Sequence, residues 1–326
     1  MLRLIPLLAA LAASPAVAAP QVVTDIAPVH SLTAAVMEGV GAPALLIPGD
    51  ASPHHFDLRP SDAAGLAEAD LVIWVGPGLT PWLEEPLETL AAGATHLTLL
   101  DTEGWTAREI GEAEDAHGHD AAHEDHAHED AHGHEDDHAH EDEHGHEDDH
   151  GHDHAGGVDP HAWLDPAVAK AWAAHIAEAL AGADPDNAAQ YRANAAALAD
   201  EMDALADEVA AQLVPAQGRA FLEAHAALGY FAARFDLVSA GSVSDSHDAA
   251  PGPAHLAELR DRIADEGITC LLTEPGPDRG WTDVLTEGTA LRTAQVDATG
   301  ALLTPGADLY PAMIRALGTA LADCLS

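Results

Sequence analysis

The sequence predicts an α/β protein built from two (βα)4 lobes, each with a parallel sheet, joined by one long rigid helix. From residue 22 onward, short apolar runs alternate with amphipathic stretches, which is typical of βα units and parallel sheets. Four such units precede an Ala-rich stretch in the middle of the chain, and four follow it. That stretch has apolar residues at helical spacing, which predicts the joining helix.

Each βα unit has a candidate strand with helical sequence after it. In the first half the expected strands are residues 21–30, 43–48, 70–76 and 95–101. In the second half they are residues 219–225, 236–243, 268–275 and 292–298, and the chain closes on a helix over 308–326. The first four units predict an N-terminal lobe over residues 19–184, and the last four predict a C-terminal lobe over residues 215–326.

The joining helix is expected over residues 185–214, where Pro185 suits an early helical position. It is longer than a typical globular helix, and its exposed face is too acidic for burial on all sides. We therefore expect a helical strut between the two lobes.

The first 18 residues have the features of a secretory signal peptide. Arg3 precedes an apolar run from Leu4 to Ala13, and small residues follow at Ala16 and Ala18. The run is too short to span a bilayer, so we expect an exported, soluble mature protein. A buried N-terminal helix is the alternative.

The chain has two cysteines, Cys270 and Cys324. In an exported protein, an even count favours a disulfide over two free thiols, which remain the alternative. The bond would close a loop of about 55 residues and stabilise the C-terminal part by about 4 kcal/mol in the chain-entropy model.

The overall charge is strongly acidic, with 12 Lys and Arg residues against 56 Asp and Glu residues, a formal net charge of -44. Nucleic acid and anionic membrane surfaces are therefore poor partners. A cation is the natural ligand class.

The segment 113–157 combines histidine and carboxylate: the sequences HAHED and HGHED recur in it with a period of six residues. Imidazole and carboxylate favour Zn²⁺, Cu²⁺ and Ni²⁺, whereas a merely solvated acidic run would not explain the repeated His-x-His. Without apolar residues larger than Ala, we expect disorder in the absence of metal, and weak, exchanging sites that fade below pH 6. The expected ligands of this loop are His117, His119, His123, His126, His128, His132, His134, His138, His140, His144, His146, His150, His152 and His154.

Outside that segment, three short motifs place histidines after expected strands or before an expected helix. These motifs are "ASPHHFDLRPSD" with His54 and His55, "DPHAWLDP" with His161, and "AHAALGYF" with His225. Ligands of parallel α/β sheets bind at the carboxyl ends of strands. We expect His175 and His255, which lie in helical stretches, to be surface or satisfied histidines, and His96 carries no sign of a site.

In their order and separation, these motifs resemble the ZnuA type of zinc-binding solute-binding proteins of bacterial ABC importers, in the cluster A-I (cluster 9) metal-binding family that also includes manganese binders. The resemblance covers essentially the whole mature chain. It includes the His-rich acidic loop, the linking helix and the late cysteine pair, which such zinc proteins often join as a disulfide.

The resemblance implies a Zn²⁺ site in the cleft between the lobes, with His54, His161 and His225 as ligands. Manganese-preferring relatives have a carboxylate at the third position, so an imidazole there favours zinc. The fourth ligand is either Asp297 or water, and Pro53 stands where some zinc-binding members have an acidic residue. His55 competes with His54, and Glu274 is expected to orient a ligating imidazole.

The resemblance also implies a monomeric periplasmic protein that delivers zinc to an ABC permease with a cytoplasmic ATPase. A periplasmic zinc chaperone is a further candidate partner. The His-rich loop would act as a low-affinity collector or sensor, and zinc binding would order the interface between the lobes with a small rocking motion.

Three alternatives remain at this point. A freestanding zinc buffer or chaperone would use the His-rich loop as its main site. A manganese-binding paralogue would prefer Mn²⁺ over Zn²⁺. A zinc hydrolase would need a placed general base, and the sequence contains no HExxH motif. The expectation is therefore a binding protein and not an enzyme.

Overall fold

A computed structural model describes residues 19–49, 51–109, 157–244, 251–276 and 280–326. The expected signal peptide over 1–18, the histidine ligands of the segment 113–157 and His247 lie outside these residues. No helix in the described part of the chain is long and apolar enough to cross a membrane.

The fold contains two parallel four-stranded sheets, as the sequence predicts. The two sheets have the same strand order, which the sequence analysis did not address. The first sheet has the order β2-β1-β3-β4 and the second the order β6-β5-β7-β8. The strands of the first sheet are β1 (Val22–Thr24), β2 (Ala44–Leu45), β3 (Leu71–Trp74) and β4 (Thr95–Thr98). Those of the second are β5 (Ala220–His225), β6 (Val238–Ser244), β7 (Cys270–Thr273) and β8 (Arg292–Gln295). All eight expected strands are present, and each is shorter than expected.

The helices cover both faces of the sheets, because the central strands are apolar on both sides. Every residue of β1 and β3 is buried. In β5, Phe221 packs with the main core, whereas the next residue, Leu222, faces a second cluster beneath α7 and α8. The helices are α1 (Ala27–Val36), α2 (Pro60–Ala67), α3 (Glu84–Thr89), α4 (Pro166–Ala183), α5 (Ala188–Leu213), α6 (Gly229–Arg234), α7 (Pro253–Glu266), α8 (Trp281–Thr286) and α9 (Leu309–Leu325).

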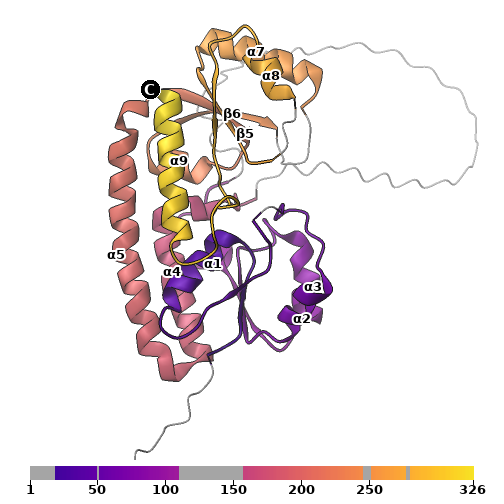
Figure 1. Cartoon of the computed structure of the whole chain (residues 1–326), viewed down its shortest axis with the longest axis vertical. Helices are drawn as coiled ribbons and strands as arrows, with labels where there is room; N and C mark the ends of the chain where they lie inside the picture. Colours follow the sequence, from indigo (N-terminus) through magenta and orange to yellow (C-terminus); the bar gives the residue numbers. More distant parts are fainter. Residues whose placement is uncertain (1–18, 50, 110–156, 245–250, 277–279) are drawn as a thin grey trace, which may run out of the picture.

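The long helix α5 has 26 residues and runs along both sheets, beside α4 and α9 (Figure 1). Its buried residues recur every three or four positions, which gives one apolar stripe facing the core. They are Tyr191, Ala195, Leu198, Met202, Leu205, Val209 and Leu213. Short 3₁₀ turns over 185–187 and 214–216 flank the helix, so Pro185 begins a turn and not the α-helix itself.

One expected strand is wrong in its second half. The segment 21–30 forms a strand only as far as Thr24, and α1 begins at Ala27. Pro28 lies in the first helical turn, where its missing N–H is tolerated, and His30 therefore lies in a helix. Four other expected strands also end earlier than predicted, at Leu45, Trp74, Thr273 and Gln295, and loops follow them.

The main apolar core is continuous from the first sheet through α4 and α5 to β5, β7 and α9. Cys270 of β7 and Cys324 of α9 form a disulfide, which confirms the expected pairing and joins α9 to the second sheet. The two halves therefore share packed side chains and are not separated by a flexible linker.

Candidate metal centre

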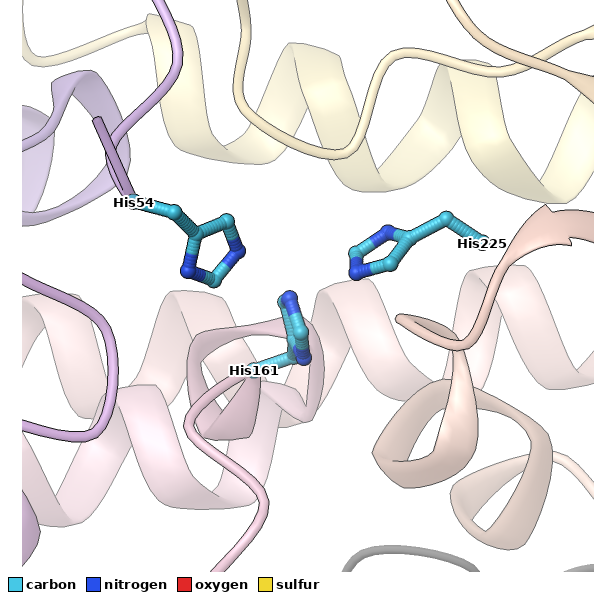
Figure 2. Close-up of side chains that lie close together, drawn as sticks. All are labelled: His54, His161 and His225. Atoms are coloured by element: carbon cyan, nitrogen blue, oxygen red, sulfur yellow. The ribbon is translucent and has the colours of Figure 1, made fainter. Parts of the chain in front are cut away.

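Three histidines from three separate segments converge between the two sheets. Each of His54, His161 and His225 offers a ring nitrogen, and the three nitrogens lie within 4.8 Å of one another. Figure 2 shows the three rings pointing toward a common centre. The ring centroids of His161 and His225 are 5.1 Å apart, and that of His54 is 6.1 Å from each. The structure thus brings together the three imidazoles that the sequence singled out.

His54 lies on the loop between β2 and α2, and Trp82 holds this loop on both sides of the histidine. The indole Nε1 of Trp82 donates a hydrogen bond of 2.8 Å to the Pro53 carbonyl. The Trp82 ring also packs against Phe56, with centroids 5.5 Å apart. The sequence reasoning gave no role to Trp82, because it follows β3 and is distant from this loop along the chain.

His161 is only 6% exposed, and Asp159 fixes its ring. Asp159 Oδ1 lies 2.7 Å from His161 Nδ1 and also accepts a hydrogen bond of 2.9 Å from the His161 backbone N–H. Nδ1 is therefore occupied, which leaves Nε2 for the centre of the cluster. Asp159 lies within the "DPHAW" motif, yet it was missed as a site residue.

Asp165 caps the helix that follows His161. Its side chain accepts a hydrogen bond from the Ala167 N–H, and Pro166 occupies the first helical turn, where its missing N–H is tolerated.

His225 is the last residue of β5 and is also 6% exposed. Glu274, just beyond β7, has its Oε1 3.4 Å from His225 Nδ1. This carboxylate lies where an orienting group for the His225 ring is expected, at the long end of hydrogen-bonding distance.

A buried carboxyl group supports the turn that follows His225. Glu223 accepts hydrogen bonds from the backbone N–H groups of Ala227 and Leu228 and from the Ser239 hydroxyl. Burial raises the pKa of Glu223 to about 7, and the hydrogen bonds and the nearby His161 oppose this rise.

Asp25, directly after β1, is a second buried carboxyl group that holds backbone, here in the first sheet. Its carboxylate accepts from the Ile26 and Val75 N–H groups at 2.7 and 2.8 Å. Burial raises the pKa of Asp25 to about 7 as well, against the opposing effect of these hydrogen bonds. Both carboxyl groups hold backbone at the carboxyl edges of the sheets, where the site is built.

The structure does not bring Asp297 into the three-histidine group. Both of its oxygens accept backbone hydrogen bonds, from Ala301 N–H at 2.9 Å and from Leu302 N–H at 2.8 Å. His55 is exposed and is also outside the group.

The remaining described histidines lie elsewhere. Nε2 of His175 lies 2.9 Å from the Glu103 carbonyl, and Nε2 of His96 lies 2.9 Å from the Ala91 carbonyl. Nδ1 of His255 lies 4.0 Å from a Glu258 carboxylate oxygen on the surface of α7. His175 and His255 are thus surface or satisfied histidines, as expected.

The fold and this histidine cluster define a two-sheet binding protein of the kind that holds a metal ion between its halves. A family model described as "Zinc-uptake complex component A periplasmic" matches residues 22–324, and the chain belongs to this family. Members of this family are solute-binding components of transport systems and not enzymes.

Curated relatives match over nearly the whole chain. The High-affinity zinc uptake system protein ZnuA of Paracoccus denitrificans is 48% identical over 307 residues, covering 94% of this chain and 92% of the relative. The protein of the same name from Brucella suis biovar 1 is 45% identical over 305 residues, covering 94% and 91%.

Solved structures share the fold at lower identity. "Crystal structure of ZnuA" superposes with a TM-score of 0.74 at 23% identity and covers 94% of this chain and all of that one. A zinc-bound ZnuA with residues 138–173 of its own chain deleted gives a TM-score of 0.71 at 22% identity, covering 94% and 98%.

Proposed function

We propose that this protein is the zinc-binding component of a zinc ABC importer and carries one Zn²⁺ between His54, His161 and His225. The observation that supports this most directly is the convergence of three imidazoles from both halves of the molecule, with nitrogens within 4.8 Å of one another. Membership of the zinc-uptake family supports the same function.

The donor set favours zinc over harder cations. Three neutral imidazoles suit tetrahedral Zn²⁺, with Zn–N distances of about 2.0–2.1 Å and therefore nitrogens about 3.3 Å apart. A small inward movement of the rings would bring the cluster to this geometry. The described cluster contains no carboxylate, which Mn²⁺ would prefer, so manganese is the weaker candidate.

A tetrahedral Zn²⁺ needs a fourth ligand in addition to the three histidines. We propose Asp297 for it, with water as the competitor. To ligate, the Asp297 carboxylate would exchange its bond to the Ala301 or the Leu302 amide for the metal. Loading would then be coupled to a rearrangement of the loop that follows β8. Glu274 would orient His225 through Nδ1.

We further propose that residues 19–184 and 215–326 act as two lobes joined by residues 185–214, and that the protein works as a periplasmic monomer after loss of residues 1–18. Its partners would be a membrane permease with a cytoplasmic ATPase. The segment 113–157, which lies outside the described residues, would collect or sense zinc with low affinity. A freestanding zinc buffer is the second candidate.

The test is a zinc titration, with chelator competition, of the full chain, of a chain lacking residues 117–154, and of His54→Ala, His161→Ala and His225→Ala. The zinc-carrier function predicts that one tight site survives the deletion and is lost in each histidine variant. Loss of all tight binding on deletion would favour the buffer. Preference for Mn²⁺ over Zn²⁺, or turnover of ester or peptide probes, would contradict the proposal.

A further inference from the structure

Tyr230 lies at a point where the second half of the molecule contacts the first. It is the second residue of α6, which begins four residues after His225, and it is only 2% exposed. Its hydroxyl oxygen accepts a hydrogen bond of 2.8 Å from the backbone N–H of Arg108. Tyr230 therefore links the helix that follows one histidine of the cluster to a segment that follows the first sheet.

That segment continues directly to the support of His161. The Arg108 carbonyl accepts a hydrogen bond of 2.8 Å from the Asp159 N–H, and Glu109 and Val158 form an antiparallel β-bridge. The carboxylate of Asp159 contacts both the backbone N–H and the ring Nδ1 of His161. Hydrogen bonds thus run from Tyr230 through Arg108 and Asp159 to His161.

The surroundings of this path are closely packed. The Trp105 ring lies 6.2 Å from that of Tyr230 and 6.1 Å from that of Trp172. Gly229 approaches Asp159 so closely that a Cβ atom there would lie 3.1 Å from the carboxylate Oδ2. Side-chain movement at either end of the path is therefore restricted.

A second link joins α6 to the other side of His161. The Arg234 guanidinium makes a two-bond ion pair with Asp165, at 2.6 and 2.7 Å, and Asp165 also caps α4. His161 thus lies between two residues, Asp159 and Asp165, that are both connected to α6. Both connections therefore lead to residues beside His161, whose ring centroid is 5.1 Å from that of His225.

We propose that Tyr230 is a positioning residue for zinc binding: its hydroxyl keeps Asp159, and through it the His161 ring, in register with His225 before the ion arrives. This role rests on the proposed function. A site whose ligands are already oriented loses less freedom on binding, so the tie raises zinc affinity without touching the metal.

The substitution Tyr230→Phe tests this role because it removes one oxygen and keeps the ring that packs against Trp105. Tyr191→Phe is the matched control. Tyr191 is also fully buried, and its hydroxyl donates a hydrogen bond of 2.9 Å to Asp184 at the α4–α5 turn, away from the cluster.

The full chain and both variants would be titrated with zinc below one equivalent against a competing chelator. The absorption spectrum of one equivalent of Co²⁺ would be recorded as well. Loss of the hydrogen bond from the Arg108 N–H predicts that Tyr230→Phe weakens zinc binding about three- to tenfold, shifts the Co²⁺ spectrum and speeds amide exchange at Asp159 in the metal-free protein. Tyr191→Phe lowers the melting temperature but leaves zinc affinity and the Co²⁺ spectrum unchanged.

Wild-type zinc affinity and an unchanged Co²⁺ spectrum in Tyr230→Phe would overturn the positioning role alone. Equal losses of zinc affinity in both variants would overturn it too, because they would report general destabilisation. A wild-type chain without a tight zinc site would overturn the proposed function together with this role.

Discussion

Gly49 and Ala301 bring two loops of the candidate site into direct contact. A Cβ atom on Gly49 would lie 2.8 Å from the Ala301 Cα and 3.3 Å from its carbonyl oxygen. Gly49 belongs to the loop that leads to His54, and the Ala301 N–H binds the Asp297 carboxylate. The position of His54 is therefore tied to the loop after β8 by a contact that leaves no space for a methyl group.

Gly49→Ala is expected to push these loops apart and to weaken zinc binding about tenfold, since an overlap with backbone atoms is relieved only by moving one loop. Gly65→Ala is the control, because nothing lies within 4 Å of the added methyl in α2. That change should raise helix stability by up to about 1 kcal/mol and leave zinc affinity unchanged. Chelator competition and thermal unfolding measure the two effects, and equal zinc affinity in both variants would contradict the importance of the contact.

Asp159→Asn is expected to lower zinc affinity about 10- to 100-fold, the usual effect of removing a carboxylate that supports a ligating histidine. The variant loses the charge that holds Nδ1 of His161. Asp203→Asn serves as a control. It also removes a charge, but from an exposed ion pair with Lys170 that joins α5 to α4. Isothermal titration against a chelator gives both affinities. An Asp159→Asn protein that binds zinc like the wild type would show that the His161 tautomer needs no support.

Trp82→Phe removes the indole N–H that binds the Pro53 carbonyl but keeps an aromatic ring beside Phe56. We expect zinc affinity to fall about three- to tenfold, the effect of one lost hydrogen bond, because the His54 loop is held less firmly. In Trp74→Phe the lost bond is to Thr98 within the first sheet. This variant should lose stability and keep its zinc affinity. If the two variants bind zinc equally well, Trp82 does not position His54.

Asp25 makes stability depend on pH in a predictable direction. Its pKa is raised from 3.8 to about 7 by burial, so between these values the folded protein keeps a proton that the unfolded chain releases. The stabilisation of the folded state by the raised pKa of Asp25 is fully present below pH 3.8 and is lost as the pH rises toward 7. The free energy of unfolding falls over this range by at most about 1.4 kcal/mol per pH unit.

Urea unfolding of metal-free wild type and Asp25→Asn at pH 5, 6, 7 and 8 measures this contribution. The free energy of unfolding of the wild type, relative to the variant, should fall from pH 5 to pH 7 and then level off. A difference that is constant with pH would show that Asp25 has the same pKa in both states.

Local pattern determined much of what could be predicted. The apolar runs identified all eight strands, and helical spacing of apolar residues identified α5. Both patterns are visible in the sequence because the buried faces of strands and helices are occupied by apolar residues at regular intervals. The ordered motifs around His54, His161 and His225 identified the cluster. The segment after Thr24 was misjudged because an apolar run with an internal proline suits a helix start as well as a strand.

What could not be predicted depends on contacts between distant segments. Trp82 supports His54 from another loop, and Tyr230 reaches Arg108 across 122 positions of sequence. The position of the Asp297 carboxylate depends on how the loop after β8 folds back on it, which no spacing rule encodes.

A crystal structure of the full chain with one equivalent of zinc, with anomalous scattering recorded at the zinc edge, tests the three-histidine zinc site most directly. A zinc ion bound by His54, His161 and His225 would give one strong peak about 2.0–2.1 Å from a ring nitrogen of each. A strong peak elsewhere, with these three rings turned apart, would contradict the three-histidine site.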